Sequence, residues 1–118
     1  MPVRSLNSSV LRWPDRREVE RRAAEWAALE GDRHPGLLRL GYFGSYARGD
    51  AGVGSDLNLV AVVESSPESF ERRATGWDLS SLPVPAELLV YTREEWENLQ
   101  RGSGRFARTL QQEARWLR

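Results

Sequence analysis

Two groups of residues in this chain have the types and spacing needed to handle a charged phosphate ligand. The first is Gly44 and Ser45, which follow an apolar segment and precede a short helical segment. Glycine lets a backbone approach a ligand closely, and serine adds a hydroxyl group. Amide groups at the start of a helix favour negative charge. This turn is therefore predicted to hold phosphate oxygens.

The second group consists of oxygen-bearing side chains on two predicted strands. Asp56 and Asn58 lie two apart in an apolar run, so a strand there places both on one face, with Leu57 and Leu59 on the other. Glu87 opens a second apolar run and joins the same site if the two strands are neighbours. Carboxylate and amide oxygens suit a hard cation such as Mg²⁺, which also takes phosphate ligands.

The elements that must position these residues are predicted from periodicity and end signals. In chain order they are helix 15–30, strand 37–43, a loop and short helix at 44–49, strand 56–63, a short helix starting at 66–68 and ending before 76, strand 84–91, a helix beginning at Thr92, and helix 105–116. Asp15 and Thr92 each precede a glutamate by three residues, a helix-start pattern, and Gly31 is expected to end the first helix. The alternation predicts an α/β or α+β layer, with helices covering a small sheet.

Length and composition limit the classes of function. The 118 residues fit one domain, predicted at 15–118 after an N-terminal arm at 1–14. The 17 basic and 17 acidic residues give zero formal net charge, so neither a nucleic acid nor an anionic membrane is expected as a stable partner. No segment has the length of a membrane span and no secretory signal pattern opens the chain, so the cytoplasm is expected. With no cysteine and a lone His34, zinc is not expected.

Taken together, the run Gly44-Ser-Tyr-Ala-Arg-Gly49 and the run Ser55-Asp-Leu-Asn58 resemble the nucleotidyltransferase superfamily that includes DNA polymerase beta, and in particular its minimal stand-alone members. That family's pattern is Gly-Ser-x-Ala-Arg-Gly, then Ser-Asp-x-Asp, then an acidic residue on a later strand. The first run matches fully, Asn58 replaces the second Asp, and Glu87 takes the later acidic position. The resemblance extends over roughly residues 15–117.

The resemblance implies an α+β fold, a small mixed β-sheet flanked by helices, and a two-metal transfer of a nucleotidyl group, AMP, from ATP. The implied roles are triphosphate binding by Gly44 and Ser45, metal binding by Asp56, Asn58 and Glu87 with Mg²⁺ or Mn²⁺, and catalysis by Asp56 and Glu87. Arg48 has two interpretations of equal weight. It either reaches a phosphate or pins its loop to a carboxylate such as Asp50.

The substitution at position 58 bears on activity. Asn58 keeps a carbonyl oxygen but loses a negative charge, and Glu87 is longer than the aspartate usual at its position, so nucleotide binding is expected to persist while turnover falls. Minimal members of the family often pair, as antitoxins, with a HEPN-type ribonuclease that they modify with AMP. The alternative to an enzyme is a degenerate binding module that holds such a partner. The sequence is also compatible with a homo-oligomer.

Overall fold

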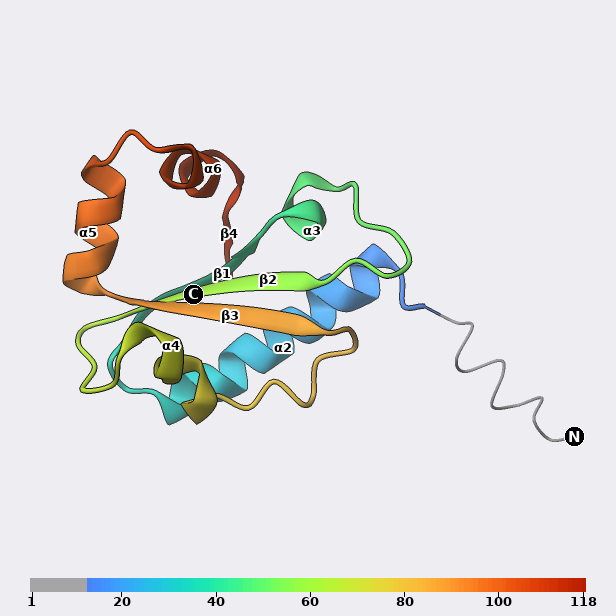
Figure 1. The fold of residues 1–118 in the computed structure, drawn as a ribbon. Helices are drawn as coiled ribbons and strands as arrows, with labels where there is room; N and C mark the ends of the chain where they lie inside the picture. Colours follow the sequence, from blue (N-terminus) through green and yellow to red (C-terminus); the bar gives the residue numbers. More distant parts are fainter. Residues whose placement is uncertain (1–12) are drawn as a thin grey trace, which may run out of the picture.

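A computed structural model describes residues 13–118, which form one sheet with helices on both faces (Figure 1). The strands are β1 (Leu37–Phe43), β2 (Leu57–Val63), β3 (Ala86–Thr92) and β4 (Arg115–Trp116). The helices are α2 (Arg16–Arg33), α3 (Ser45–Arg48), α4 (Phe70–Arg73), the 3₁₀ turn η1 (Ala74–Gly76), α5 (Arg93–Arg101) and α6 (Arg105–Glu113).

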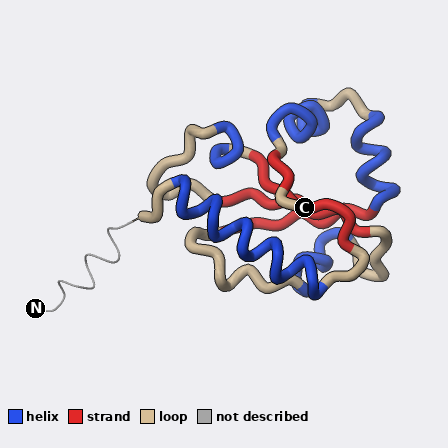
Figure 2. Tube along the Cα trace, turned by 180° about the vertical axis from the view of Figure 1, so that it is seen from behind, coloured by secondary structure: helices blue, strands red, loops and turns tan. Residues whose placement is uncertain are grey.

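The sheet is mixed and has the strand order β3-β2-β1-β4. Strand β2 runs parallel to β3 and antiparallel to β1, and β4 pairs antiparallel with β1. Helices α2 and α4 cover one face, whereas α5 and α6 cover the other (Figure 1). Figure 2, from behind, shows α2 crossing the sheet along its length. The α+β class and the small mixed sheet expected from the resemblance are therefore confirmed.

Alternation along the central strand β2 separates two hydrophobic cores. Leu57 and Leu59 face α2 and pack with its buried stripe, whereas Val60 and Val62 face α5 and α6. Each of the five tryptophans packs in or against one of these cores, as packing anchors do: Trp13, Trp26 and Trp77 with the first, Trp96 and Trp116 with the second. Burial of each large apolar side chain stabilises the fold by about 1.5–3 kcal/mol.

Local end signals located most helix starts correctly. Asp15 caps α2 by accepting a hydrogen bond from the Glu18 amide at 2.8 Å. Thr92 and Glu95 form the expected reciprocal capping box at the start of α5. The predicted arm falls mostly outside the described residues, but Trp13 donates from Nε1 to the Tyr46 hydroxyl at 3.3 Å. Within residues 13–118, no helix is both long and apolar enough to cross a membrane.

Two helix boundaries predicted before β3 were wrong. Gly31 does not end α2, which continues to Arg33 and is capped by His34, whose backbone amide donates to the Gly31 carbonyl at 3.4 Å. Helix α4 begins at Phe70 rather than at 66–68. There, the Ser66 hydroxyl accepts a hydrogen bond from the Glu68 amide at 3.2 Å, a local turn that competes with helix formation.

The end of the chain also differs from the prediction. Helix α6 stops at Glu113 instead of continuing to residue 116, because Ala114 adopts extended backbone angles of φ −58° and ψ 135°. The next two residues form β4, in which Arg115 pairs with Tyr42 and Trp116 pairs with Gly41. This fourth strand returns the chain to β1, just ahead of the Gly44 turn.

Candidate active site

The turn at Gly44 connects β1 to the short helix α3 and requires glycine. Its backbone angles, φ 83° and ψ −152°, belong to a region that other residues rarely adopt. A Cβ atom at this position would also lie 2.6 Å from Nδ2 of Asn58. The turn therefore packs directly on the side chain at position 58, as expected if both belong to one site.

Ser45 follows at the first position of α3 and is half-buried. Its carbonyl oxygen accepts hydrogen bonds from the amides of Gly49 and Asp50, at 2.9 and 3.1 Å, which closes the loop. Its hydroxyl makes no hydrogen bond with another side chain or backbone group of residues 13–118. The hydroxyl is therefore available to a ligand at the turn.

The parallel pairing of β2 and β3 brings two predicted ligands together. Asn58 and Glu87 are direct register partners, so their side chains project to the same face. That face carries Val60 and Val62, which makes it the side covered by α5 and α6. Asn58 is partly buried and Glu87 is exposed, so the pair lies at the open end of the covered face.

Asp56 lies just before β2 rather than in it, since the strand predicted from residue 56 begins at Leu57. Two contacts hold the chain on either side of Asp56. The Ser55 amide donates to the Gly52 carbonyl at 3.0 Å, and the Leu57 amide donates to the Pro85 carbonyl at 2.9 Å. The Asp56 side chain is exposed, two residues before Asn58.

The donor set suits one Mg²⁺ or Mn²⁺ ion better than two. Asp56 and Glu87 offer carboxylates and Asn58 offers an amide oxygen, and Mg²⁺ is commonly bound by one or two carboxylates with phosphate and water completing its shell. Within residues 13–118, no cluster of three or more His, Cys, Asp or Glu side chains has the geometry of a metal site. The oxygen donors present have the chemistry to hold one such cation only if substrate phosphates and water complete its shell.

Arg48 lies between two carboxylates. Its Nε donates to Asp50 at 3.1 Å, and its Nη1 lies 3.3 and 3.4 Å from the two carboxylate oxygens of Glu113. The hydrogen bond with Asp50, followed by that with Glu113, raises the pKa of the Arg48 guanidinium above its usual value. This arrangement corresponds to the second interpretation of Arg48, in which the arginine fixes its loop by pairing with a carboxylate such as Asp50.

Sequence reasoning missed the contribution of the C-terminal segment to this site. Oε1 of Glu113 accepts a hydrogen bond from the Gly44 amide at 3.1 Å, across 69 residues of sequence. Arg115 donates from Nε to the Ala47 carbonyl at 2.8 Å. Both residues fall in the stretch predicted as uninterrupted helix, and no local signal distinguishes them from surface charges. Their roles depend on β4, which turns the chain towards α3.

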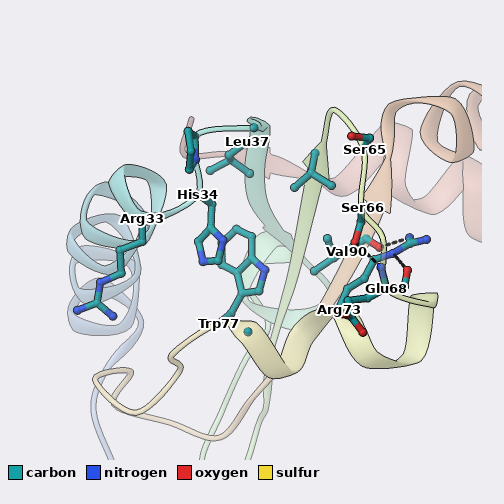
Figure 3. Close-up of a pocket in the computed structure, with 13 residues that line it drawn as sticks. Arg33, His34, Leu37, Ser65, Ser66, Glu68, Arg73, Trp77 and Val90 are labelled. Atoms are coloured by element: carbon teal, nitrogen blue, oxygen red, sulfur yellow. Dashed lines mark hydrogen bonds between the residues drawn. The ribbon is translucent and has the colours of Figure 1, made fainter.

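A pocket of about 300 Å³ lies at the opposite end of the sheet from these residues (Figure 3). It is lined by Leu37 and Val63, at the start of β1 and the end of β2. His34 is partly buried and is stacked on Trp77, with ring centroids 3.7 Å apart. Arg73 in this pocket is held by Glu95 at 2.5 and 3.1 Å. None of the predicted site residues lines this pocket.

Comparison with known proteins agrees with the geometry. The family model described as a nucleotidyltransferase domain matches residues 31–117. A crystal structure described as a nucleotidyltransferase from Sulfolobus solfataricus is similar in fold, with TM-score 0.62 and 18% identity, covering 86% of this chain and 80% of that one. A toxin–antitoxin crystal structure with AMP-PNP is similar at TM-score 0.50 and 16% identity, over 84% and 72%. Among curated proteins, no sequence matches.

The match of the family model includes β1, the Gly44 turn, β2, β3 and the C-terminal segment. It therefore extends over most of the described fold and contains each residue of the candidate site. The similar structures support the same fold. This chain belongs to the nucleotidyltransferase domain family.

Proposed function

We propose that this protein binds ATP together with Mg²⁺ or Mn²⁺ and transfers AMP, slowly, to a hydroxyl group of a partner protein. The hydroxyl oxygen bonds to the α-phosphorus of ATP, and pyrophosphate and the hydroxyl proton are released. The observation that supports this most is the register pairing of Asn58 with Glu87, beside the turn at Gly44. This pairing brings two of the proposed cation ligands together, next to the turn that is proposed to hold phosphate. The toxin–antitoxin relative that was solved with AMP-PNP supports a nucleotide and a protein partner.

Each residue has a distinct proposed task. The Gly44 backbone and the Ser45 hydroxyl hold phosphate oxygens. Asp56, Glu87 and the carbonyl oxygen of Asn58 hold the cation, which when bound neutralises triphosphate charge and favours displacement at phosphorus. Glu87 is exposed and lies on β3 at the edge of the sheet, so it can also orient an acceptor hydroxyl that approaches from outside.

The acceptor is proposed to be a protein because the site is open. Asp56 and Glu87 are both exposed, and neither of the pockets at Trp77 and at Trp13 includes them. A macromolecular acceptor would supply the missing wall of the site and exclude water. The proposed partner is a helical HEPN-type protein, as in the minimal nucleotidyltransferases that this chain resembles.

A second candidate is a binding module without chemistry. It is favoured by Asn58, which leaves the site with two carboxylates where the family pattern has three. Loss of one preorganised electrostatic group costs on the order of 10²–10³ in rate, by analogy with removal of an oxyanion-hole donor. In this case the protein would hold ATP or its partner but leave both unmodified.

The deciding experiment is incubation with ATP labelled at the α-phosphate, a divalent cation and a candidate HEPN-type partner. Covalent label on the partner supports the transferase, and its absence in Asp56→Asn serves as the control. Binding of ATP that depends on the cation, without label, supports the binding module. Absence of cation-dependent ATP binding at millimolar concentration contradicts the transferase and a module that holds ATP, and leaves only a module that holds its partner.

A further inference from the structure

The C-terminal end of α6 places a carboxylate on the turn that is proposed to hold phosphate. Oε1 of Glu113 lies 3.1 Å from the Gly44 amide nitrogen. The same carboxylate lies 3.3 Å from Nη1 of Arg48. The side chain of Glu113 is only 20% exposed, so these protein groups, more than water, satisfy its charge.

This location is unfavourable for a carboxylate unless the turn compensates for it. Glu113 is the last residue of α6, and the C-terminal end of a helix disfavours negative charge. The Gly44 amide and the Arg48 guanidinium supply that compensation. The backbone that follows Glu113 is fixed by two contacts. Arg115 donates a hydrogen bond to the Ala47 carbonyl, and Trp116 pairs with Gly41 in the sheet.

The contacts of Glu113 are those that an anionic phosphate oxygen would make. Carboxylate and phosphate oxygens accept the same charge-assisted hydrogen bonds from amides and guanidinium groups. One amide hydrogen cannot serve both acceptors fully, and a triphosphate beside an ionised carboxylate meets like-charge repulsion. The two anions therefore exclude each other at this turn.

We propose that Glu113 is an affinity-determining residue, an internal anion that occupies the Gly44 turn and must leave it before a triphosphate binds. This inference rests on the proposed function, because it concerns the same phosphate site. If Glu113 occupies the turn for about nine-tenths of the time, the apparent affinity for triphosphate is reduced about tenfold. Removing its charge restores that affinity.

The test compares Glu113→Gln with Glu97→Gln, which makes the same change of charge at an exposed position of α5. Calorimetry measures binding of inorganic tripolyphosphate and of Mg-ATP to both variants and to the natural protein. Binding to Glu113→Gln is expected to be about tenfold tighter, with Glu97→Gln unchanged. In nuclear magnetic resonance spectra, the Gly44 amide signal should shift in Glu113→Gln alone.

A second variant, Glu113→Asp, keeps the charge but shortens the side chain, so it guards against a folding defect in the first. It should also bind triphosphate more tightly than the natural protein, and thermal melting shows whether each variant is folded. Equal or weaker binding by folded Glu113→Gln, or an unmoved Gly44 signal, overturns the inference while leaving ATP binding by the natural protein intact. If tripolyphosphate binds more tightly to Glu113→Gln than to the natural protein but ATP binds to neither, the inference stands and the proposed function fails. No binding of either ligand overturns both.

Discussion

Asn58 and Glu87 are register partners across the parallel strands β2 and β3, and they project from the same face of the sheet. An amide therefore occupies a position beside a carboxylate where the family pattern has a second aspartate. The amide causes no repulsion with Glu87 when no cation is bound. At the proposed cation site, this substitution is expected to weaken cation binding, because one negative charge is missing.

Replacing Asn58 by aspartate should introduce repulsion when no cation is bound and should strengthen cation binding. The Asn58→Asp variant should be less stable than the natural protein without divalent cation, because three neighbouring carboxylates repel one another. It should gain more stability from Mg²⁺ or Mn²⁺ than the natural protein does, because the added ligand strengthens cation binding. Transfer of label to a partner should rise, on the order of 10²–10³-fold. The measurements are melting temperature against cation concentration and the rate of labelling.

The matched control for this change is Asn98→Asp, an exposed asparagine of α5. That variant adds the same charge away from Asp56 and Glu87 and should show no new response to cation. A melting temperature of Asn58→Asp that is indifferent to cation would contradict the assignment of position 58 to the cation site. A cation response without faster labelling would favour the binding module.

A methyl group at Gly44 should destabilise the protein for two reasons. The φ angle of Gly44, 83°, disfavours any side chain, and the new Cβ would lie 2.6 Å from Nδ2 of Asn58. Gly54→Ala is the control, because Gly54 has a similar φ of 89° but nothing within 4 Å of the added atom. We expect Gly44→Ala to lose roughly 1–3 kcal/mol, more than Gly54→Ala loses. Urea denaturation of both variants measures this difference, and equal losses would show that contact with Asn58 is unimportant.

The parts of the fold that sequence predicted well have strong local signals. Strand β1 was predicted over its full length, because an apolar run ends there at a glycine turn. The start of α5 was predicted because the Thr92–Glu95 capping box is formed by residues three apart. The sequence left the pairing of β2 with β3 as a condition, which the structure meets, and their register places Asn58 beside Glu87.

The parts that sequence did not predict depend on contacts between distant residues. Strand β4 is two residues long, too short for a period, and it forms because Trp116 and Arg115 reach the free edge of β1. In sequence, Glu113 cannot be distinguished from a helical surface carboxylate. Its hydrogen bond with the Gly44 amide depends on β4, which turns the chain back towards Gly44. Gly31 has the sequence signature of a helix end, but it lies inside α2, with the Arg118 guanidinium packed against it.

The docking of β4 leads to a third prediction, at Gly41. A Cβ atom there would collide with the backbone carbonyl of Arg115 and lie 2.8 Å from the ring of Trp116. Gly41→Ala should therefore separate β4 from β1 and cost about 1–3 kcal/mol, as overpacking does. Gly52→Ala adds the same group into open space and should have little effect. Hydrogen exchange should accelerate at the Leu117 amide, which bonds to the Leu40 carbonyl at 2.7 Å, and unchanged exchange would contradict the prediction.

The last prediction concerns pH and Glu95. Hydrogen bonds from Arg73 are the largest influence on this carboxyl and hold its pKa below the usual 4.5; partial burial opposes them and the Thr92 amide assists. Because the folded pKa is depressed, the unfolded chain takes up the proton first as pH falls. The stability that Glu95 contributes is therefore fully present above pH 4.5 and is lost as pH falls through the folded pKa.

The variant Glu95→Gln removes this titration while keeping the shape of the side chain. It should be less stable than the natural protein at pH 7, and the difference should narrow as pH falls below 4.5. Urea midpoints measured from pH 7 down to the acid transition test this, with Glu97→Gln as an exposed control of equal charge change. A stability difference that stays constant over that range would mean that the ion pair of Glu95 with Arg73 does not form in solution. Of the two glutamates compared, Glu95 is the one expected to show the narrowing, because its carboxylate accepts hydrogen bonds from Arg73 and from the Thr92 amide.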